Sequence, residues 1–470
     1  MNEERKSGFL RNWMSVLRSD ISSIKLKELV IPGSHDSNTV WLKKWHPGYP
    51  FAACQSLGIY EQLERGIRML DLRYGPGDAK YTVIDQHGPV RGGDFMITFK
   101  DIRRFLQNYP EEFIIINMQN IVKLPSKNLE FLIENILVLL TEYLITQSDM
   151  DEWFDMETVT MGDIFAKQKR VLLFSWSSLW EETKYTAEEC RHMGIHLQSD
   201  CIVSRWHNTD KVDVMFQNNI SDLQDWNMRN LHAKKLFAIQ IVLTIQGGWR
   251  DILKYFCGLN LPTIYKLASK VIRDNNLLKF LSQALSLGAN LIILDYIEIE
   301  LSAIEMIIMY NVSHVIDIKA CYIGTRNCTK LFHRGLVESR MLLVTNLKGI
   351  FKSIKSRNKQ IIVVYSFNDG PLRVSIVGNK SKKVLIYKNP LDEDSRETPG
   401  KDVLVFFKSN KYIVEKLTAE DEQVIDNKSP WTNSIKGQPF LMIRNNVLTI
   451  ISESAYTSMM LDQSLERILH

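Results

Sequence analysis

Short apolar runs recur along the first two-thirds of this chain, and helix-like stretches lie between them. This alternation predicts an α/β fold in which helices connect strands of a mainly parallel sheet. The strand candidates are residues 27–31, 67–73, 81–86, 113–118, 170–175, 195–199, 235–243 and 291–295. Their number and order favour a distorted (β/α) barrel of the TIM type. In such a barrel the functional side chains lie at the carboxyl ends of the strands.

The pattern changes after a helical stretch that spans Leu301 to Tyr310. From there the chain consists of short β-rich runs separated by turns such as Asn368-Asp369-Gly370-Pro371, which predicts an antiparallel, sandwich-like, all-β domain. A chain of 470 residues with 45% hydrophobic residues is long enough for both. We therefore expect a barrel over residues 1–311 and a smaller β-rich domain of unknown role over residues 312–470.

The first candidate site follows the apolar run that ends at Ile31. Pro32 and Gly33 are expected to stop this strand, and the loop after them carries His35 and Asp36. Side chains placed at the end of a rigid strand are well suited to catalysis. A hydrogen-bonded turn is the alternative interpretation of a His-Asp pair at such a position.

Two further strand candidates add charged groups to this site. In the run from Ile67 to Tyr74, strand alternation places Asp71 and Arg73 on one face, where a carboxylate and a guanidinium could bind an anion. An exposed ion pair is the alternative, which the apolar neighbours disfavour. A later run ends in His87 before a Gly-Pro break. Two histidines and an arginine suit phosphodiester cleavage, as base, acid and phosphate clamp.

The motifs IPGSHDSNT, LDLR and QHGP, in this order and at this spacing, resemble the X-type catalytic domain of phosphatidylinositol-specific phospholipases C. Further similar stretches lie at residues 110–117, 205–210 and 236–244. The chain is most similar to small eukaryotic proteins that contain an X domain without the usual signalling modules, and more distantly to secreted bacterial enzymes. The resemblance covers roughly the first two-thirds of the chain.

The resemblance implies a role for each matched residue. His35 corresponds to the general base that deprotonates the inositol 2-hydroxyl, and His87 to the general acid that protonates the diacylglycerol oxygen. Asp36 would support the acid histidine, and Asp71 would orient Arg73. Arg73 stands where metal-independent bacterial enzymes have an arginine and calcium-dependent enzymes have an acidic metal ligand. We therefore expect no metal and no cofactor, since a guanidinium repels a divalent cation.

Several positions depart from the family pattern and put the headgroup preference in doubt. Gln119 replaces a lysine of the bacterial enzymes and a metal-binding glutamate of the calcium-dependent ones. Phe174 or Ser175 stands where the bacterial site has an arginine. Substrate contacts are expected from Gln119, Ser175, Trp206 and Asn208. Asp295, which ends the apolar run from Leu291, matches the aspartate that orients the base, with a helix-capping role as the alternative.

Three functions remain open at this point. The first is a metal-independent phospholipase C that cleaves phosphatidylinositol-type lipids to diacylglycerol and a cyclic inositol phosphate. The second is a metal-dependent phosphodiesterase of the glycerophosphodiester or sphingomyelinase D type, which Arg73 and Gln119 disfavour. The third is a barrel that binds phosphoinositides without catalysis. The expected partner is a membrane phospholipid, and the sequence does not identify protein partners.

Composition narrows the location and the partners. The net charge of +4 is small, and no basic array with interleaved aromatic residues argues for a nucleic-acid partner. The chain shows no secretory signal, and its six cysteines are widely spaced without metal-ligand spacing. We therefore expect reduced thiols in a cytoplasmic protein, with peripheral association with a membrane left open.

Two segments have both a structural and a membrane-binding interpretation. The amphipathic stretch within Met1 to Asp20 predicts either a helix packed on the barrel or a membrane-surface anchor. The basic cluster between Lys348 and Lys359 suits either a solvated loop or contact with anionic lipid. The acidic loop Asp392-Glu393-Asp394 is weak evidence for a calcium-binding membrane domain.

Overall fold

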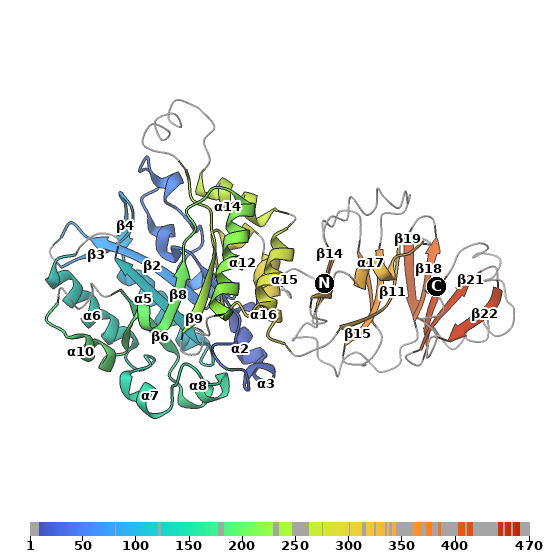
Figure 1. Ribbon diagram of the computed structural model, residues 1–470, viewed down its shortest axis with the longest axis horizontal. Coiled ribbons are helices and arrows are strands. Elements are labelled where there is room, and N and C mark those ends of the chain that lie inside the picture. The colour runs from blue at the N-terminus through green and yellow to red at the C-terminus, as the bar shows by residue number, and fades with distance from the viewer. Residues whose placement is uncertain are drawn as a thin grey trace. The chain divides into compact units, whose positions relative to one another are not determined.

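The chain divides into two units, Met1–Val312 and Ser313–His470, which are described separately (Figure 1). The basic cluster at 348–359, the acidic loop at 392–394 and Cys257 lie outside the described residues. The computed structural model describes residues 9–79, 81–120, 124–176, 183–228, 235–246, 263–274, 276–299, 301–312, 316–323, 326–333, 336–337, 341–344, 361–367, 373–377, 384–386, 403–408, 411–416, 440–444, 447–452 and 455–460.

A ten-stranded sheet forms the centre of the first unit. Eight of its strands pair in parallel in the order β7-β6-β5-β2-β1-β10-β9-β8. Strands β3 and β4 form an antiparallel hairpin beside β2. The strands are β1 (Ile31–Ser34), β2 (Met69–Pro76), β3 (Val83–His87), β4 (Val90–Asp94), β5 (Ile114–Asn120), β6 (Val171–Ser175), β7 (Ile195–Leu197), β8 (Ile202–Arg205), β9 (Leu236–Ile241) and β10 (Leu291–Leu294).

Helices surround these strands (Figure 1). Helix α10 packs on β7, α12 on β9 and α16 on β1. The helices and 3-10 turns are η1 (Leu10–Asn12), α2 (Trp13–Val16), α3 (Arg18–Ile21), η2 (Ser37–Trp41), η3 (Tyr49–Phe51), α4 (Ile59–Glu64), α5 (Met96–Asn108), α6 (Ser126–Leu140), α7 (Gln147–Glu152), α8 (Met161–Lys167), α10 (Ala187–His192), α11 (Gln198–Cys201), α12 (Val212–Met228), α14 (Ile264–Ile272), α15 (Leu277–Ser286), η5 (Ile297–Ile299) and α16 (Leu301–Met309).

The central parallel strands are buried where both of their faces are covered. Every residue of β6, β9 and β10 is buried, as expected for strands with side chains of the sheet on one face and helices on the other. Within the described residues the end strands β7 and β8 do not pair with each other. The predicted α/β fold with a distorted barrel is therefore confirmed.

One of the predicted barrel strands is wrong. The run at 81–86 forms β3, which pairs antiparallel with β2, because the connection from Pro76 to Val83 is too short for a parallel crossover. The eighth parallel strand is β8, which the sequence did not reveal. It has only four residues, and because two of them are Ser204 and Arg205, the sequence shows no apolar run at this position.

The predicted end of the first strand is also wrong, because Pro32 and Gly33 lie inside β1 rather than after it. A side chain at Gly33 would meet Met69 of β2 at 3.1 Å and Ile293 of β10 at 3.3 Å. Because glycine has no side chain, the side chains of Met69 and Ile293 can occupy the space beside β1. His35 still follows the end of the strand, so its placement is unaffected.

The amphipathic N-terminal stretch packs on the barrel. Phe9, Leu10, Trp13, Met14 and Leu17 are all buried, which agrees with the first of its two interpretations. A fully buried ion pair between Arg68 and Glu112 (2.7 Å) holds this stretch, because Arg68 donates to the carbonyl of Arg11 and Glu112 accepts from the backbone N–H of Ser15. Within the described residues, no helix combines the length and the apolar character needed to cross a membrane.

In the part of the second unit that the structure describes there are three antiparallel sheets and one short helix, α17 (Thr329–His333). Its antiparallel β structure is confirmed, whereas the sandwich packing of the sheets stays a prediction. The strands are β11 (Ile316–Ile323), β12 (Arg326–Asn327), β13 (Leu336–Val337), β14 (Met341–Val344), β15 (Ile361–Phe367), β16 (Arg373–Val377), β17 (Val384–Ile386), β18 (Val403–Lys408), β19 (Lys411–Lys416), β20 (Phe440–Arg444), β21 (Val447–Ser452) and β22 (Ala455–Met460).

Candidate active site

Strand register brings the candidate residues together at one end of the barrel. Ser34, the last residue of β1, lies beside Leu294 of β10 and Leu70 of β2. The next residue along each of these strands is His35, Asp295 or Asp71. His35 and Asp295 therefore lie directly after the carboxyl ends of β1 and β10, where barrel proteins place functional groups, and Asp71 lies beside them within β2.

His35 is held by Asp295. Its Nδ1 donates a hydrogen bond of 2.8 Å to Asp295 Oδ1, because a carboxylate oxygen only accepts. In the neutral tautomer the lone pair is then on Nε2, which lies 3.6 Å from Asp36 Oδ2. Burial alone would lower the pKa of His35, but the charges of Asp36 and Asp295 outweigh it and raise this pKa to about 9.

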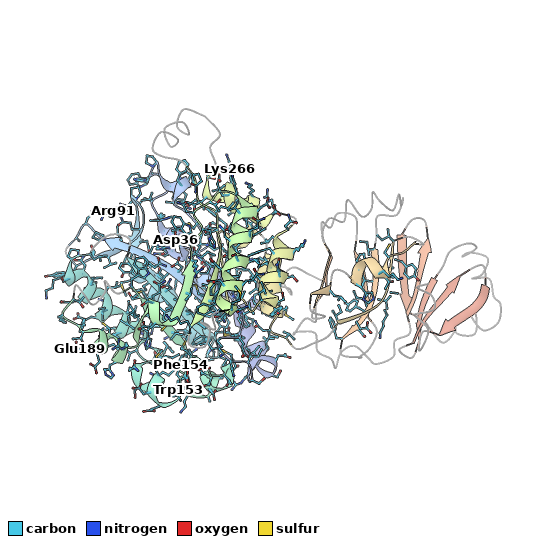
Figure 2. All side chains as sticks on the ribbon, viewed as in Figure 1. Asp36, Arg91, Trp153, Phe154, Glu189 and Lys266 are labelled. Atoms are coloured by element: carbon cyan, nitrogen blue, oxygen red, sulfur yellow. The ribbon has the colours of Figure 1, made fainter. Side chains whose placement is uncertain are left out.

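Asp36, which Figure 2 labels within the first unit, is almost completely buried and contacts two imidazoles and a guanidinium. One of its oxygens, Oδ2, lies 3.6 Å from His35 Nε2 and 3.4 Å from His87 Nε2. The other, Oδ1, lies 2.7 Å from Arg73 Nε. Although burial raises the pKa of Asp36, its cationic neighbours, above all Arg73, hold this pKa well below its usual range. Asp36 is therefore a permanent anion between the two imidazoles.

Arg73 also contacts a second carboxylate. Its Nη2 lies 3.2 Å from Asp71 Oδ2. Gln119, the neighbour of Arg73 on β5, donates to the other oxygen of Asp71 over 3.1 Å. Burial opposes the charge of Arg73, but Asp36 and Asp71 raise its pKa above the usual value. The guanidinium is thus a fixed positive charge at the pocket.

Asn38 and Asp85 support Arg73 from beneath, and sequence reasoning did not identify either. Asn38 accepts a hydrogen bond from the backbone N–H of Arg73 (2.9 Å) and donates to its carbonyl (2.6 Å). It also donates to the buried carboxyl of Asp85. Asn38 belongs to the IPGSHDSNT motif, which was the available signal, but its contact with β2 depends on the three-dimensional fold.

His87 ends β3 and faces Asp36 from the hairpin. Its Nδ1 donates to the carbonyl of Ala52 over 2.6 Å, so Nε2 is the ring nitrogen that faces Asp36. The hairpin, rather than a barrel strand, therefore supplies the second histidine.

Cys54 is a further residue that the sequence did not indicate. It is completely buried against the cluster, with Sγ 3.6 Å from Asp36 Oδ2. Burial, together with the charges of Asp295 and Asp36, raises the pKa of its thiol well above the usual value. It follows a 3-10 turn, where no strand or helix pattern in the sequence could reveal its direction.

A cavity of about 690 Å³ opens over these groups. Its polar floor contains His35, Asp36, Cys54, Arg73, His87 and Asp295. Apolar side chains such as Phe51, Trp176, Leu243 and Ile264 line other parts of it. This combination suits a ligand with an anionic group and an apolar part.

The four expected substrate contacts differ in position. Gln119 and Trp206 line the cavity. Ser175 is completely buried, and neither it nor Asn208 is among the lining residues. Asn208 accepts a hydrogen bond from Gln246 instead. The substrate-binding roles of all four stay predictions.

Several donor groups in the cluster are close enough to share a metal ion. The sets are His35, Cys54 and Asp295; Asp36, Cys54 and His87; and His35, Asp36 and Asp71, with the atoms of each set within 4.8 Å of one another. Arg73 contacts two of these carboxylates and opposes a hard dication bound between them. The expectation of a metal-free site stays a prediction.

Comparison with known proteins identifies relatives of the chain. The mouse PI-PLC X domain-containing protein 2 is 26% identical over 186 residues, which are 35% of this chain and 53% of the relative. The 1-phosphatidylinositol phosphodiesterase of Listeria monocytogenes is 32% identical over 112 residues, 23% of this chain and 33% of the relative. The chain thus spans about half the length of the mouse protein and about a third of the length of the bacterial one. No family model matches it.

Among solved structures, the phosphatidylinositol-specific phospholipase C from Listeria monocytogenes aligns with 64% of this chain and 98% of its own, at 22% identity and a TM-score of 0.48. The curated relatives confirm the resemblance that the sequence motifs predicted.

Proposed function

We propose that this chain is a phosphatidylinositol-specific phospholipase C that works without a metal ion. The observation that carries the proposal is the arrangement around Asp36. Two imidazole Nε2 atoms lie 3.6 and 3.4 Å from one carboxylate oxygen, and a guanidinium lies 2.7 Å from the other. These groups are an acid, a base and an anion clamp within one cavity.

In the proposed reaction, His35 Nε2 takes the proton of the inositol 2-hydroxyl. The resulting oxygen attacks phosphorus, and Arg73 stabilises the charge that develops on the non-bridging oxygens. His87 Nε2–H protonates the diacylglycerol oxygen as its bond to phosphorus breaks. The products are diacylglycerol and a cyclic inositol phosphate, which water could open with the same two histidines in reversed roles.

Asp295 and Asp36 have different parts in this mechanism. Asp295 fixes the tautomer and the orientation of His35 and stabilises the imidazolium that forms after proton uptake. Asp36 stabilises positive charge on either histidine in turn. Arg73 is the proposed substitute for a divalent cation, since it supplies the positive charge that such a cation would provide.

The proposed substrate is a lipid, so the chain would act at a membrane surface as a peripheral protein. The lining of the cavity supports this proposal, because Phe51, Trp176, Leu243 and Ile264 offer apolar contacts beside the charged floor. The phosphorylation state of the inositol headgroup stays open.

Phosphorus NMR of phosphatidylinositol vesicles tests the proposed function. We expect wild-type protein to form a cyclic inositol phosphate, and His35→Ala and His87→Ala to form it at least about 100-fold more slowly. His192→Ala is the matched control, because His192 lies on the exposed helix α10. A folded, vesicle-bound wild-type protein that forms no product would contradict the proposal and favour a binding protein.

A further inference from the structure

The floor of the cavity contains a set of groups that the proposed reaction does not use together. The thiol of Cys54, the carboxylate of Asp36 and the imidazole of His87 converge from separate segments of the chain. Asp36 follows β1, Cys54 follows η3, and His87 ends β3. Their ligand atoms all lie within 4.8 Å of one another.

We infer that Asp36, Cys54 and His87 form a binding site for a thiophilic divalent cation such as Zn²⁺, and that this cation inhibits the proposed phosphodiesterase. The binding step stands independently, whereas the inhibition rests on the proposed function. The cation acts here as an inhibitor, so the site is compatible with metal-free catalysis.

Two of the three distances between the ligand atoms fit tetrahedral zinc, and the third, from Cys54 Sγ to the imidazole nitrogen of His87, is at most 4.8 Å. Zinc bonds of about 2.0–2.3 Å to nitrogen, oxygen and sulfur place ligand atoms roughly 3.3–3.6 Å apart in a tetrahedron. Asp36 Oδ2 lies 3.4 Å from His87 Nε2 and 3.6 Å from Cys54 Sγ. A cation could therefore bind with only small movements of these side chains.

The orientation of His87 also suits a metal ligand. Its Nδ1 donates to the carbonyl of Ala52, which leaves the Nε2 lone pair of the neutral ring directed toward Asp36. A backbone carbonyl behind a ligating histidine is a usual way to fix its tautomer and orientation. The hydrogen bond is already present without a cation.

The donor set determines which cations can bind. Thiolate and imidazole favour Zn²⁺, Co²⁺ and Cd²⁺, whereas Ca²⁺ requires six or more oxygen ligands. Arg73 contacts the other oxygen of Asp36, so Asp36 can offer a cation only one oxygen freely. We therefore expect Ca²⁺ and Mg²⁺ to have no effect at concentrations where Zn²⁺ binds.

Binding would block the proposed reaction directly. A cation on His87 Nε2 occupies the atom that carries the proton for the leaving group. It also neutralises Asp36, which stabilises the protonated histidines. The proposed reaction assigns no step to Cys54, whose thiol donates to Asp36.

Cobalt is a suitable probe, because Co²⁺ bound by a thiolate gives a charge-transfer band in the near ultraviolet. We expect chelator-stripped full-length protein to show this band with one equivalent of Co²⁺, and Zn²⁺ to remove it by displacement. Cys54→Ser should abolish the band. Cys190→Ser, which alters another buried free thiol on α10, should retain it. A band that survives in Cys54→Ser, or that never forms in wild type, would overturn the site.

A second variant keeps the test decisive if Cys54→Ser does not fold. His87→Gln keeps the thiol and removes the imidazole, and we expect it to bind Co²⁺ at least about tenfold more weakly. Unchanged affinity would overturn the assignment of His87 as a ligand.

Lipid cleavage separates the two parts of the inference. We expect Zn²⁺ to stop cleavage in wild type and chelator to restore it. Cleavage that Zn²⁺ leaves unchanged or accelerates, while the cobalt band forms, would overturn the inhibition. If the band forms but wild-type protein cleaves no lipid in zinc-free buffer, the metal site stands and the proposed function fails.

Discussion

Among single residues, one buried carboxylate with three basic neighbours is central to the proposed site. Asp36 has a left-handed backbone conformation, with φ at 43°, which aspartate tolerates better than most residues. This turn directs its side chain between His35, His87 and Arg73. Strain of this kind concentrates at functional sites, where the surrounding structure can hold it.

The raised pKa of His35 predicts an unusual pH dependence. As the proposed base, His35 must be neutral, so kcat/KM should rise with pH until the pH passes about 9. Asp295→Asn removes one of the charges that raise this pKa. The rising limb of its profile should therefore move down by at least about one pH unit, although the rate falls.

A pH-rate profile of both proteins checks this prediction. Asp78→Asn is the control, because Asp78 is highly exposed and is paired with Arg91 on the hairpin, away from the cavity floor. An acid limb that lies at the same pH in wild type and Asp295→Asn would contradict the role of Asp295.

The sequence predicted the position of a site residue when that residue belongs to or directly follows a parallel strand of the barrel. It did not predict the positions of site residues on other turns. His35 and Asp295 directly follow parallel strands, and Arg73 lies in the second half of the parallel strand β2. The carboxyl ends of such strands must meet. Cys54, Asn38 and Asp85 reach the same place through turns and a hairpin. No periodicity in the sequence encodes such contacts, which arise only when distant segments pack together.

At the scale of elements, the β3–β4 hairpin and the N-terminal helices were the least predictable parts. A strand with buried faces has the same apolar pattern whether it pairs in parallel or antiparallel, so the pattern at 81–86 could not reveal a hairpin. Only the short connection to β2 could have done so. The burial of the N-terminal stretch depends on the ion pair between Arg68 and Glu112. Arg68 precedes β2, and Glu112 lies in the segment before β5.

The Arg68–Glu112 pair gives a stability prediction. Arg68→Ala leaves Glu112 as an uncompensated buried charge and removes hydrogen bonds to the carbonyls of Leu63, Ile67 and Arg11. We expect it to lower the free energy of unfolding of the first unit by about 3–5 kcal/mol.

Urea denaturation measures this effect. Lys184→Ala is the matched control, because Lys184 forms an exposed ion pair with Glu134 and its loss should cost less than about 1 kcal/mol. Equal effects of the two substitutions would show that Arg68 does not anchor the N-terminal helices.

At the scale of the whole molecule, the chain consists of two units with separate cores. The core of the second unit includes Ile318, Phe332, Ile361 and Val363. The residues that form the candidate site all belong to the first unit. The sequence indicated this division through its change from alternating helices and strands to short β-rich runs, but a change in pattern carries no information about what the second unit binds.

The division predicts that a fragment of residues 1–312 folds alone. We expect it to unfold cooperatively and to cleave a water-soluble inositol phosphodiester with a kcat within about threefold of the full chain. Circular dichroism and a soluble-substrate assay test this. An aggregated or inactive fragment would mean that the second unit completes the fold or the site.

We propose that Arg73 takes the place of a metal ion, and the cleavage of phosphatidylinositol vesicles in excess chelator is the sharpest test of this role. We expect wild type and Arg91→Lys to be fully active, because Arg91, labelled in Figure 2, lies on the hairpin and does not line the cavity. Arg73→Lys should lose about 100-fold in rate, because an ammonium cannot reproduce the two-sided contact of a guanidinium. Activity that disappears with chelator and returns with Ca²⁺ or Mg²⁺, or an Arg73→Lys variant as active as wild type, would contradict the account.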